Sequence, residues 1–85
     1  MTSAIDMIAA RAEALFSSDL PAGSHPSRAQ ADAAIVRALR RHGGVRGCAA
    51  ELAAWYGERP DTAVPRMRWA RCTVEALYPR RRAPQ

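Results

Sequence analysis

The sequence predicts an all-α protein that forms a compact four-helix domain. Three observations favour this class. Apolar residues recur at three- and four-residue steps in four separate stretches, and residues that start or stop helices flank these stretches. The chain has 85 residues, which is enough for one modest core. We therefore expect helices near residues 3–16, 27–42, 47–56 and 62–78, in a single domain (1–79) followed by a disordered basic tail (80–85).

The first expected helix begins at Ser3, whose side chain suits an N-cap. Its predicted buried stripe consists of Ile5, Ile8, Ala12, Leu15 and Phe16. Prolines, a glycine and several serines follow in residues 17–26, which predicts a loop. Leu20 is the one large apolar residue of this loop, and we expect it to anchor the loop to the core.

The second expected helix has the clearest boundaries. Ser27 and Gln30 have the spacing of a capping box, and Gly43-Gly44 after His42 is a typical C-terminal stop. The predicted buried stripe is Ala31, Ala34, Ile35, Ala38 and Leu39. The predicted basic face on the other side is Arg37, Arg40 and Arg41.

The third and fourth expected helices meet at a turn after Gly57, which is expected to end the third. Val45 is predicted to staple the start of the third helix, whose apolar face is Cys48 (or Ala49), Leu52, Trp55 and Tyr56. Thr62 is the expected N-cap of the fourth helix, which puts Pro65 at its third position. The predicted stripe of the fourth helix is Val64, Met67, Ala70, Val74, Leu77 and Tyr78.

The charge of the chain is a weak argument for a nucleic-acid partner. The formal net charge is +5, all 13 basic residues are arginine, lysine and asparagine are absent, and 19 residues are alanine. This composition is typical of a GC-rich genome. Arg80, Arg81 and Arg82 supply three of the charges, so the helical domain itself carries only about +2. We find no secretory signal and no apolar run of membrane-spanning length. We therefore expect a cytoplasmic protein that does not bind a membrane.

The sequence offers no catalytic, cofactor-binding or metal-binding residues, and we expect neither an enzyme nor a cofactor. His25 lies in a loop and His42 at a helix end, and no paired carboxylates or nucleophile motif accompany them. Cys48 and Cys72 lack the spacing of zinc ligands. We interpret them as two small buried hydrophobic residues on neighbouring helices rather than as a disulfide.

Residues 48–69 resemble a helix-turn-helix motif. In that family an alanine four residues before the turn glycine lets the two helices approach closely, and Ala53 and Gly57 have this spacing. The resemblance implies that the second helix enters the major groove of DNA by its N-terminal residues. It implies base contacts from Thr62, Ala63 and Arg66, and phosphate contacts from Arg59, Arg68, Arg80, Arg81 and Arg82. Arg71 on the same helix is a further candidate nucleic-acid contact.

The same residues also fit an ordinary helical hairpin, which we favour over DNA contact. Arg66 and Arg68 project about 200° apart on a helix of 3.6 residues per turn, so they do not form one reading face. Glu75 follows Arg71 by four residues and is placed to pair with it.

A wider resemblance covers residues 15–71. The Leu15-Phe16 pair with Ser18 and Leu20, together with the later Gly-Cys-Ala and Arg-Met-Arg-Trp-Ala segments, is similar to a class of small actinobacterial helical proteins of unassigned function. This resemblance implies a cytoplasmic helical protein from a GC-rich bacterium and carries no activity with it.

The function predicted from these observations is that of a small helical binding or regulatory module, acting through a protein partner or self-association. A homodimer is one form of such self-association, because it would bury further apolar surface and stabilise a chain with a small core. Trp69 lies off the apolar stripe of its helix, and half-buried tryptophans anchor interfaces, so Trp69 is the expected partner contact. The alternative is a DNA-binding protein that uses the third and fourth helices.

Overall fold

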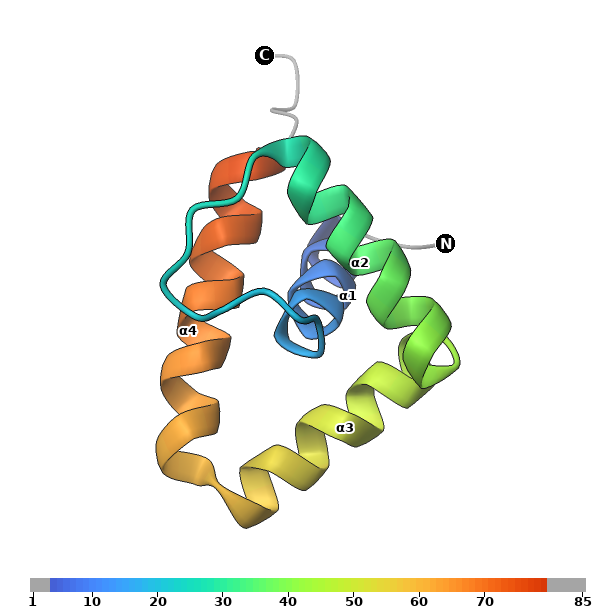
Figure 1. Ribbon diagram of the computed structural model, residues 1–85, viewed down its shortest axis with the longest axis vertical. Helices are drawn as coiled ribbons and strands as arrows, with labels where there is room; N and C mark the ends of the chain where they lie inside the picture. The colour runs from blue at the N-terminus through green and yellow to red at the C-terminus, as the bar shows by residue number, and fades with distance from the viewer. Residues whose placement is uncertain (1–3, 80–85) are drawn as a thin grey trace.

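The computed structural model describes residues 4–79, in which four helices and no strand are found. They are α1 (Ala4–Phe16), α2 (Arg28–His42), α3 (Val45–Glu58) and α4 (Pro60–Leu77). The predicted all-α, four-helix class is confirmed. In Figure 1, α2, α3 and α4 surround the C-terminal end of α1. Ser3 and the expected tail, residues 80–85, lie outside the described residues.

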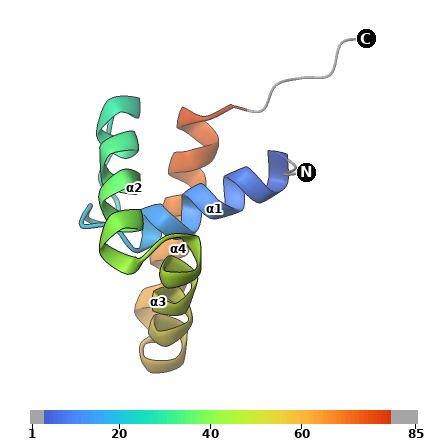
Figure 2. The same ribbon diagram turned by 90° about the vertical axis from the view of Figure 1, so that its right-hand side faces the viewer.

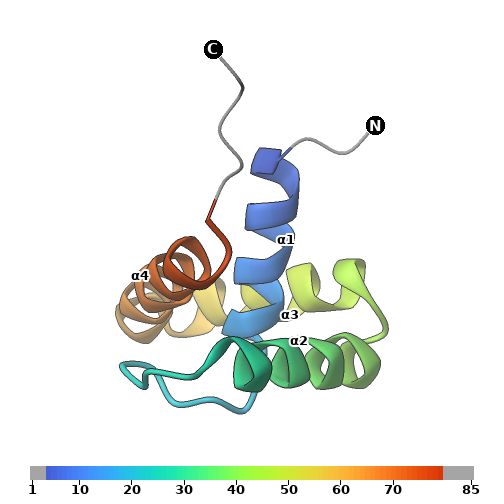
Figure 3. The ribbon, with the colours of Figure 1, turned by 90° about the horizontal axis from the view of Figure 1, so that it is seen from above.

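The helix α1 has an unusual place, because it crosses the other three helices steeply. Figures 2 and 3 show its C-terminal end among them and its N-terminal end projecting away from them. Ala12, Leu15 and Phe16 of the predicted stripe are buried, whereas Ile8 is only partly buried. Ala14 is off the stripe and is also buried, against Ala38 and Cys48, because neighbouring helices cover α1 on more than one side.

The core is thin, and more than half of its buried residues are alanines. The largest side chains that are fully buried are Leu15, Val74 and Cys48. Small residues let helix backbones approach closely, so the core gains dispersion energy from density more than from volume. Other large apolar side chains, including Leu52, are only partly buried and pack at its margins.

The boundaries of α2 agree with the sequence. The backbone N–H of Gln30 donates to Ser27 Oγ (3.1 Å), and the N–H of Ser27 donates to Gln30 Oε1 (2.8 Å), which completes the capping box. Gly43 and Gly44 adopt φ angles of 78° and 97°, a region that favours glycine, and the Gly44 N–H donates to the Leu39 carbonyl (2.7 Å). Leu20 also packs against the core as predicted.

The helix α3 is two residues longer at each end than predicted, so the roles predicted for Val45 and Gly57 are wrong. The helix begins at Val45, immediately after the N-cap Gly44, and Val45 is 54% exposed and does not staple the helix. Gly57 lies inside α3 and does not end it. A glycine ends a helix where the backbone turns left-handed, and the φ angle of Gly57 is not positive.

The start predicted for α4 is also wrong. The helix begins at Pro60 rather than after Thr62, because the fixed φ of proline suits the first helical position. Pro65 therefore lies one turn deeper in the helix than predicted. Ala63, not Val64, is the buried residue of the first turns, while Val64 is 44% exposed.

Tyr78 joins three helices at the end of α4. Its hydroxyl donates to Asp32 on α2, and the guanidinium groups of Arg11 and Arg28 lie 4.3 and 4.4 Å from its ring centroid. Cations placed over an aromatic ring are attracted by its negative face. Burial, followed by the hydrogen bond to Asp32, raises the pKa of Tyr78 to about 12. The buried Tyr78 side chain therefore connects α1, α2 and α4.

The raised pKa of Tyr78 predicts a loss of stability at alkaline pH. An exposed tyrosine ionises near pH 10, whereas Tyr78 in the folded protein ionises near pH 12. Between these two pH values the unfolded chain therefore loses its phenolic proton while the folded chain keeps it. Protonated Tyr78 stabilises the folded state fully below pH 10, and the free energy of unfolding should fall by about 2 kcal/mol as the pH rises from 10 to 12. Denaturant unfolding followed at several pH values measures the loss. Tyr78→Phe keeps the ring without the titrating group, so the extra alkaline decline should be absent from it.

The Tyr78→Phe comparison also removes the effects of other groups. Burial raises the pKa of the Cys48 thiol as well, but Cys48 is present in both proteins and its effect cancels in their difference. Parallel curves for the two proteins between pH 10 and 12 would contradict the prediction.

Candidate functional site

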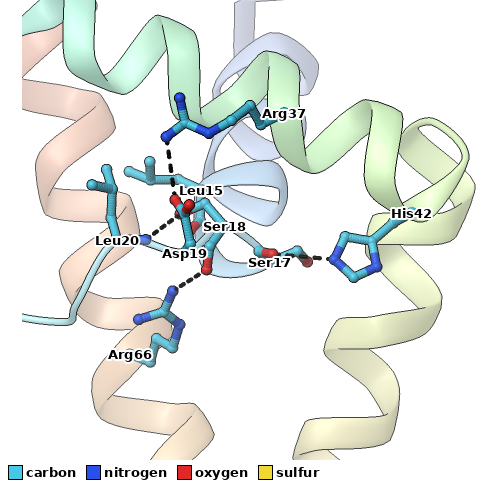
Figure 4. A network of polar contacts seen from close by, with 8 residues as sticks. All are labelled: Leu15, Ser17, Ser18, Asp19, Leu20, Arg37, His42 and Arg66. Atoms are coloured by element: carbon cyan, nitrogen blue, oxygen red, sulfur yellow. Dashed lines mark hydrogen bonds and ion pairs between the residues drawn. The ribbon is translucent and has the colours of Figure 1, made fainter.

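The carbonyl end of α1 is bonded to side chains from α2 and α4 (Figure 4). Arg66 donates from Nε to the Phe16 carbonyl (2.7 Å) and from Nη2 to the Ser18 carbonyl (2.9 Å). His42 donates from Nε2 to the Ser17 carbonyl (3.2 Å). The last carbonyls of a helix have no partner within it and carry its negative dipole charge, so a guanidinium is a fitting group there.

Arg66 is held inside the fold. Its guanidinium carbon lies 5.7 Å from the centroid of the Phe16 ring and 5.1 Å from that of Trp69. Burial lowers the pKa of Arg66, although the group keeps its charge at physiological pH. The sequence indicated Arg66 as a base contact in DNA. To reach a base, its side chain would have to break its bonds to the Phe16 and Ser18 carbonyls.

Trp69 is half-buried, as predicted. Its Nε1 donates to the Ser24 carbonyl (2.9 Å), which fastens the loop between α1 and α2 onto α4. The ring also packs against the main core cluster. The polar atom of this indole is thus already bonded within the chain, and the partner contact assigned to Trp69 stays a prediction.

The hairpin of α3 and α4 differs from the arrangement that residues 48–69 suggested. Ala53 is exposed, so it does not bring the two helices together, and Gly57 is not in a turn. Arg59 alone separates α3 from α4. The packing expected at Ala53 is therefore wrong, because α3 turns its larger residues toward the core.

The other nucleic-acid candidates do not form one surface. Arg59, Thr62, Arg68 and Arg71 are all exposed, but only Arg68 and Arg71 line the same hollow, on the outer side of α4. Arg80, Arg81 and Arg82 lie outside the described residues.

The basic face of α2 is present and partly neutralised. Arg37, Arg40 and Arg41 are exposed and line an open hollow of about 420 Å³ near Ser17 and Ser18. Arg37 pairs with Asp19 at 3.3 Å, and the two side chains are 57% and 59% exposed. An ion pair this exposed contributes little to stability. The face is a solvated surface with two further arginines, Arg40 and Arg41.

The two cysteines differ in their surroundings. Cys48 is buried and its thiol donates to the Ala38 carbonyl at 3.7 Å, as expected for a small core residue. Cys72 is exposed on α4, so the prediction that both are buried is wrong for Cys72. Both thiols are free. Between residues 4 and 79 no group of three or more histidine, cysteine or acidic side chains is placed to hold a metal ion.

The candidate binding surface is a groove between α1, α3 and α4, which we call the α1–α3–α4 groove. Its volume is about 340 Å³. The groove is lined by Ile8, Ala9, Ala12, Glu13, Leu52, Tyr56, Met67, Arg71 and Glu75. Its large apolar side chains, Ile8, Leu52, Tyr56 and Met67, belong to the predicted stripes, but they are partly buried because the N-terminal half of α1 projects beyond the other helices.

The charged residues of the groove make no ion pair with one another. Glu13 comes from α1, whereas Arg71 and Glu75 lie one turn apart on α4. The predicted pair of Arg71 with Glu75 is wrong, since the one ion pair among the described residues is that of Arg37 with Asp19. The groove thus has an apolar floor and three charged side chains that form no ion pair with any other described residue.

Sequence reasoning found the apolar floor of the groove but not the groove itself. Leu52, Tyr56 and Met67 were predicted as core, and the stripes contain no signal that distinguishes core positions from positions at its margin. Glu13 lies five residues after Ile8 on α1, and only the steep crossing of α1 brings it next to α4.

No family model, curated protein or solved structure matches this chain. Among residues 4–79, the four helices include none that is both long enough and apolar enough to span a membrane.

Proposed function

We propose that this protein is a small, non-enzymatic helical binding module that acts through protein contacts, and that its contact surface is the α1–α3–α4 groove. The observation that carries the proposal is the combination of a partly buried apolar floor with charges at its edge that form no ion pair with any residue the structure describes. Interfaces have this arrangement, in which an apolar centre is surrounded by polar groups. We also propose the cytoplasm as its location, because two free thiols fit a reducing compartment.

The groove supports a protein contact better than the two other surfaces that the sequence indicated. The hollow at the α2 face is lined by charged residues and serines, and Ala38 is its one apolar lining residue. Trp69 makes its polar contact within the chain. The groove, in contrast, leaves the apolar side chains of Ile8, Leu52, Tyr56 and Met67 incompletely covered. Covering partly exposed apolar area is the main favourable term in protein association.

Site-specific photo-crosslinking in the producing cell tests the proposal. A photo-reactive amino acid replaces Val64, which lies in the hollow that adjoins the groove and shares Tyr56 and Met67 with it. The control replaces Val36, an equally exposed valine on α2 (45% against 44% exposed). We expect protein adducts from position 64 and few from position 36. Equal labelling at both positions, or none at position 64, would contradict the proposed function.

A further inference from the structure

The two charges that α4 contributes to the groove have a reciprocal arrangement. Arg71 and Glu75 are both exposed and lie four residues apart, about 6 Å along the helix axis. If two α4 helices face one another in antiparallel directions about a two-fold axis between these positions, Arg71 of each lies opposite Glu75 of the other. A single surface contact then makes two identical ion pairs.

The mixed charge of the groove also argues for a copy of the same chain. A two-fold axis brings a surface against itself, so a surface of one charge sign would repel its copy. The edge of this groove carries Glu13 and Glu75 together with Arg71, and none of the three pairs with another described residue. The surface is therefore complementary to itself.

The groove floor supplies the apolar centre that such a contact needs. Tyr56, Met67, Arg71 and Glu75 line both the groove and the adjoining hollow, so the apolar floor and the charged pair belong to one continuous surface across α4. The fully buried core of the single chain is thin. A second copy placed against Met67 would add buried apolar area that the single chain lacks.

We propose that the occupant of the α1–α3–α4 groove is a second copy of this chain, in a two-fold dimer in which Arg71 of each copy pairs with the partner's Glu75. This inference rests on the proposed function and names the partner for it. With Arg71 opposite the partner's Glu75, the end of the partner's α4 lies opposite residue 69, so its last turn lies against Met67 in the groove. The N-terminal half of α1 forms one wall of the interface.

Sedimentation of the intact chain over about a hundredfold range of concentration tests the dimer. We expect a reversible monomer–dimer equilibrium for the wild type. Arg71→Glu places like charges opposite one another twice in each dimer, and should weaken the dimer about tenfold. Glu75→Arg should do the same. The double variant Arg71→Glu/Glu75→Arg exchanges the two charges and should return the dissociation constant to within about threefold of wild type.

Arg40→Glu is the matched control, because it makes the same change of charge at an exposed position on α2. It should leave the dimer within about twofold of wild type. Circular dichroism of each variant at a concentration where it is monomeric checks that the helices are intact. A wild type that stays monomeric at all concentrations would overturn the inference. The inference would also be overturned if the double variant Arg71→Glu/Glu75→Arg formed a dimer no tighter than those of the two single variants.

The two proposals fail in different ways. If the wild type is monomeric but position 64 still gives adducts, the adducts are with another protein and only the dimer is wrong. If position 64 gives no adducts, the proposed function itself is wrong. If the dimer is correct, the adducts at position 64 have twice the mass of the single chain, which is 9.3 kDa. The yield of these adducts should fall in Arg71→Glu.

Discussion

Replacing Arg66 by methionine should lower the free energy of unfolding by about 3 kcal/mol. The change removes two charge-assisted hydrogen bonds, of 2.7 and 2.9 Å, and takes their donor from the partly buried Phe16 and Ser18 carbonyls at the end of α1 and just after it. Methionine retains most of the side-chain volume against the Phe16 and Trp69 rings, so the loss reports the bonds rather than a cavity. Urea unfolding followed by circular dichroism measures the change.

Two further variants make the Arg66 experiment specific. Arg68→Met removes an exposed guanidinium from the same helix and should change the free energy of unfolding by less than about 0.5 kcal/mol. Arg66→Lys keeps the charge but loses the planar fork that reaches two carbonyls, so it should fall between wild type and Arg66→Met. If Arg66→Met were as stable as Arg68→Met, Arg66 would not hold α1 in place.

The features that sequence predicted well are those set by neighbouring residues. Ser27 and Gln30 close their capping box within one turn, and Gly43 and Gly44 end α2 by their own backbone angles. The stripes of α1 and α2 were also predicted, because their periodicity is a property of each helix alone. Such signals need no knowledge of the rest of the molecule.

The features that sequence did not predict depend on residues far away in the chain. Arg66 resembled a surface arginine, but its acceptors, the Phe16 and Ser18 carbonyls, lie about fifty residues earlier. The groove exists because α1 crosses the other helices steeply, and no periodicity encodes a crossing angle. Where two local signals competed, as Pro60 and Thr62 did for the start of α4, the sequence offered no measure of which is stronger.

Replacing Gly47 by alanine should also cost about 3 kcal/mol, for a reason that lies in the backbone. After Gly43 and Gly44 reverse the chain, the first turn of α3 lies directly against the last residue of α2. A Cβ atom at Gly47 would overlap the backbone carbonyl group of His42. This neighbour is main chain, so a change of rotamer cannot relieve the overlap and the corner between the two helices must shift. Thermal and urea unfolding both measure the loss.

Gly57→Ala is the matched variant, and the structure predicts the opposite sign for it. Gly57 also lies within α3, but apart from its chain neighbours and the nearby backbone of its own helix, no atom lies within 4 Å of the Cβ position that alanine would occupy. Alanine in an exposed helix interior is favoured over glycine by about 0.5–1 kcal/mol, since the unfolded chain loses less entropy on folding. Gly57→Ala should therefore stabilise the protein, which a turn glycine with a positive φ would not allow. Destabilisation by Gly57→Ala would contradict the helical assignment of Gly57, and a neutral Gly47→Ala would contradict the tight corner between α2 and α3.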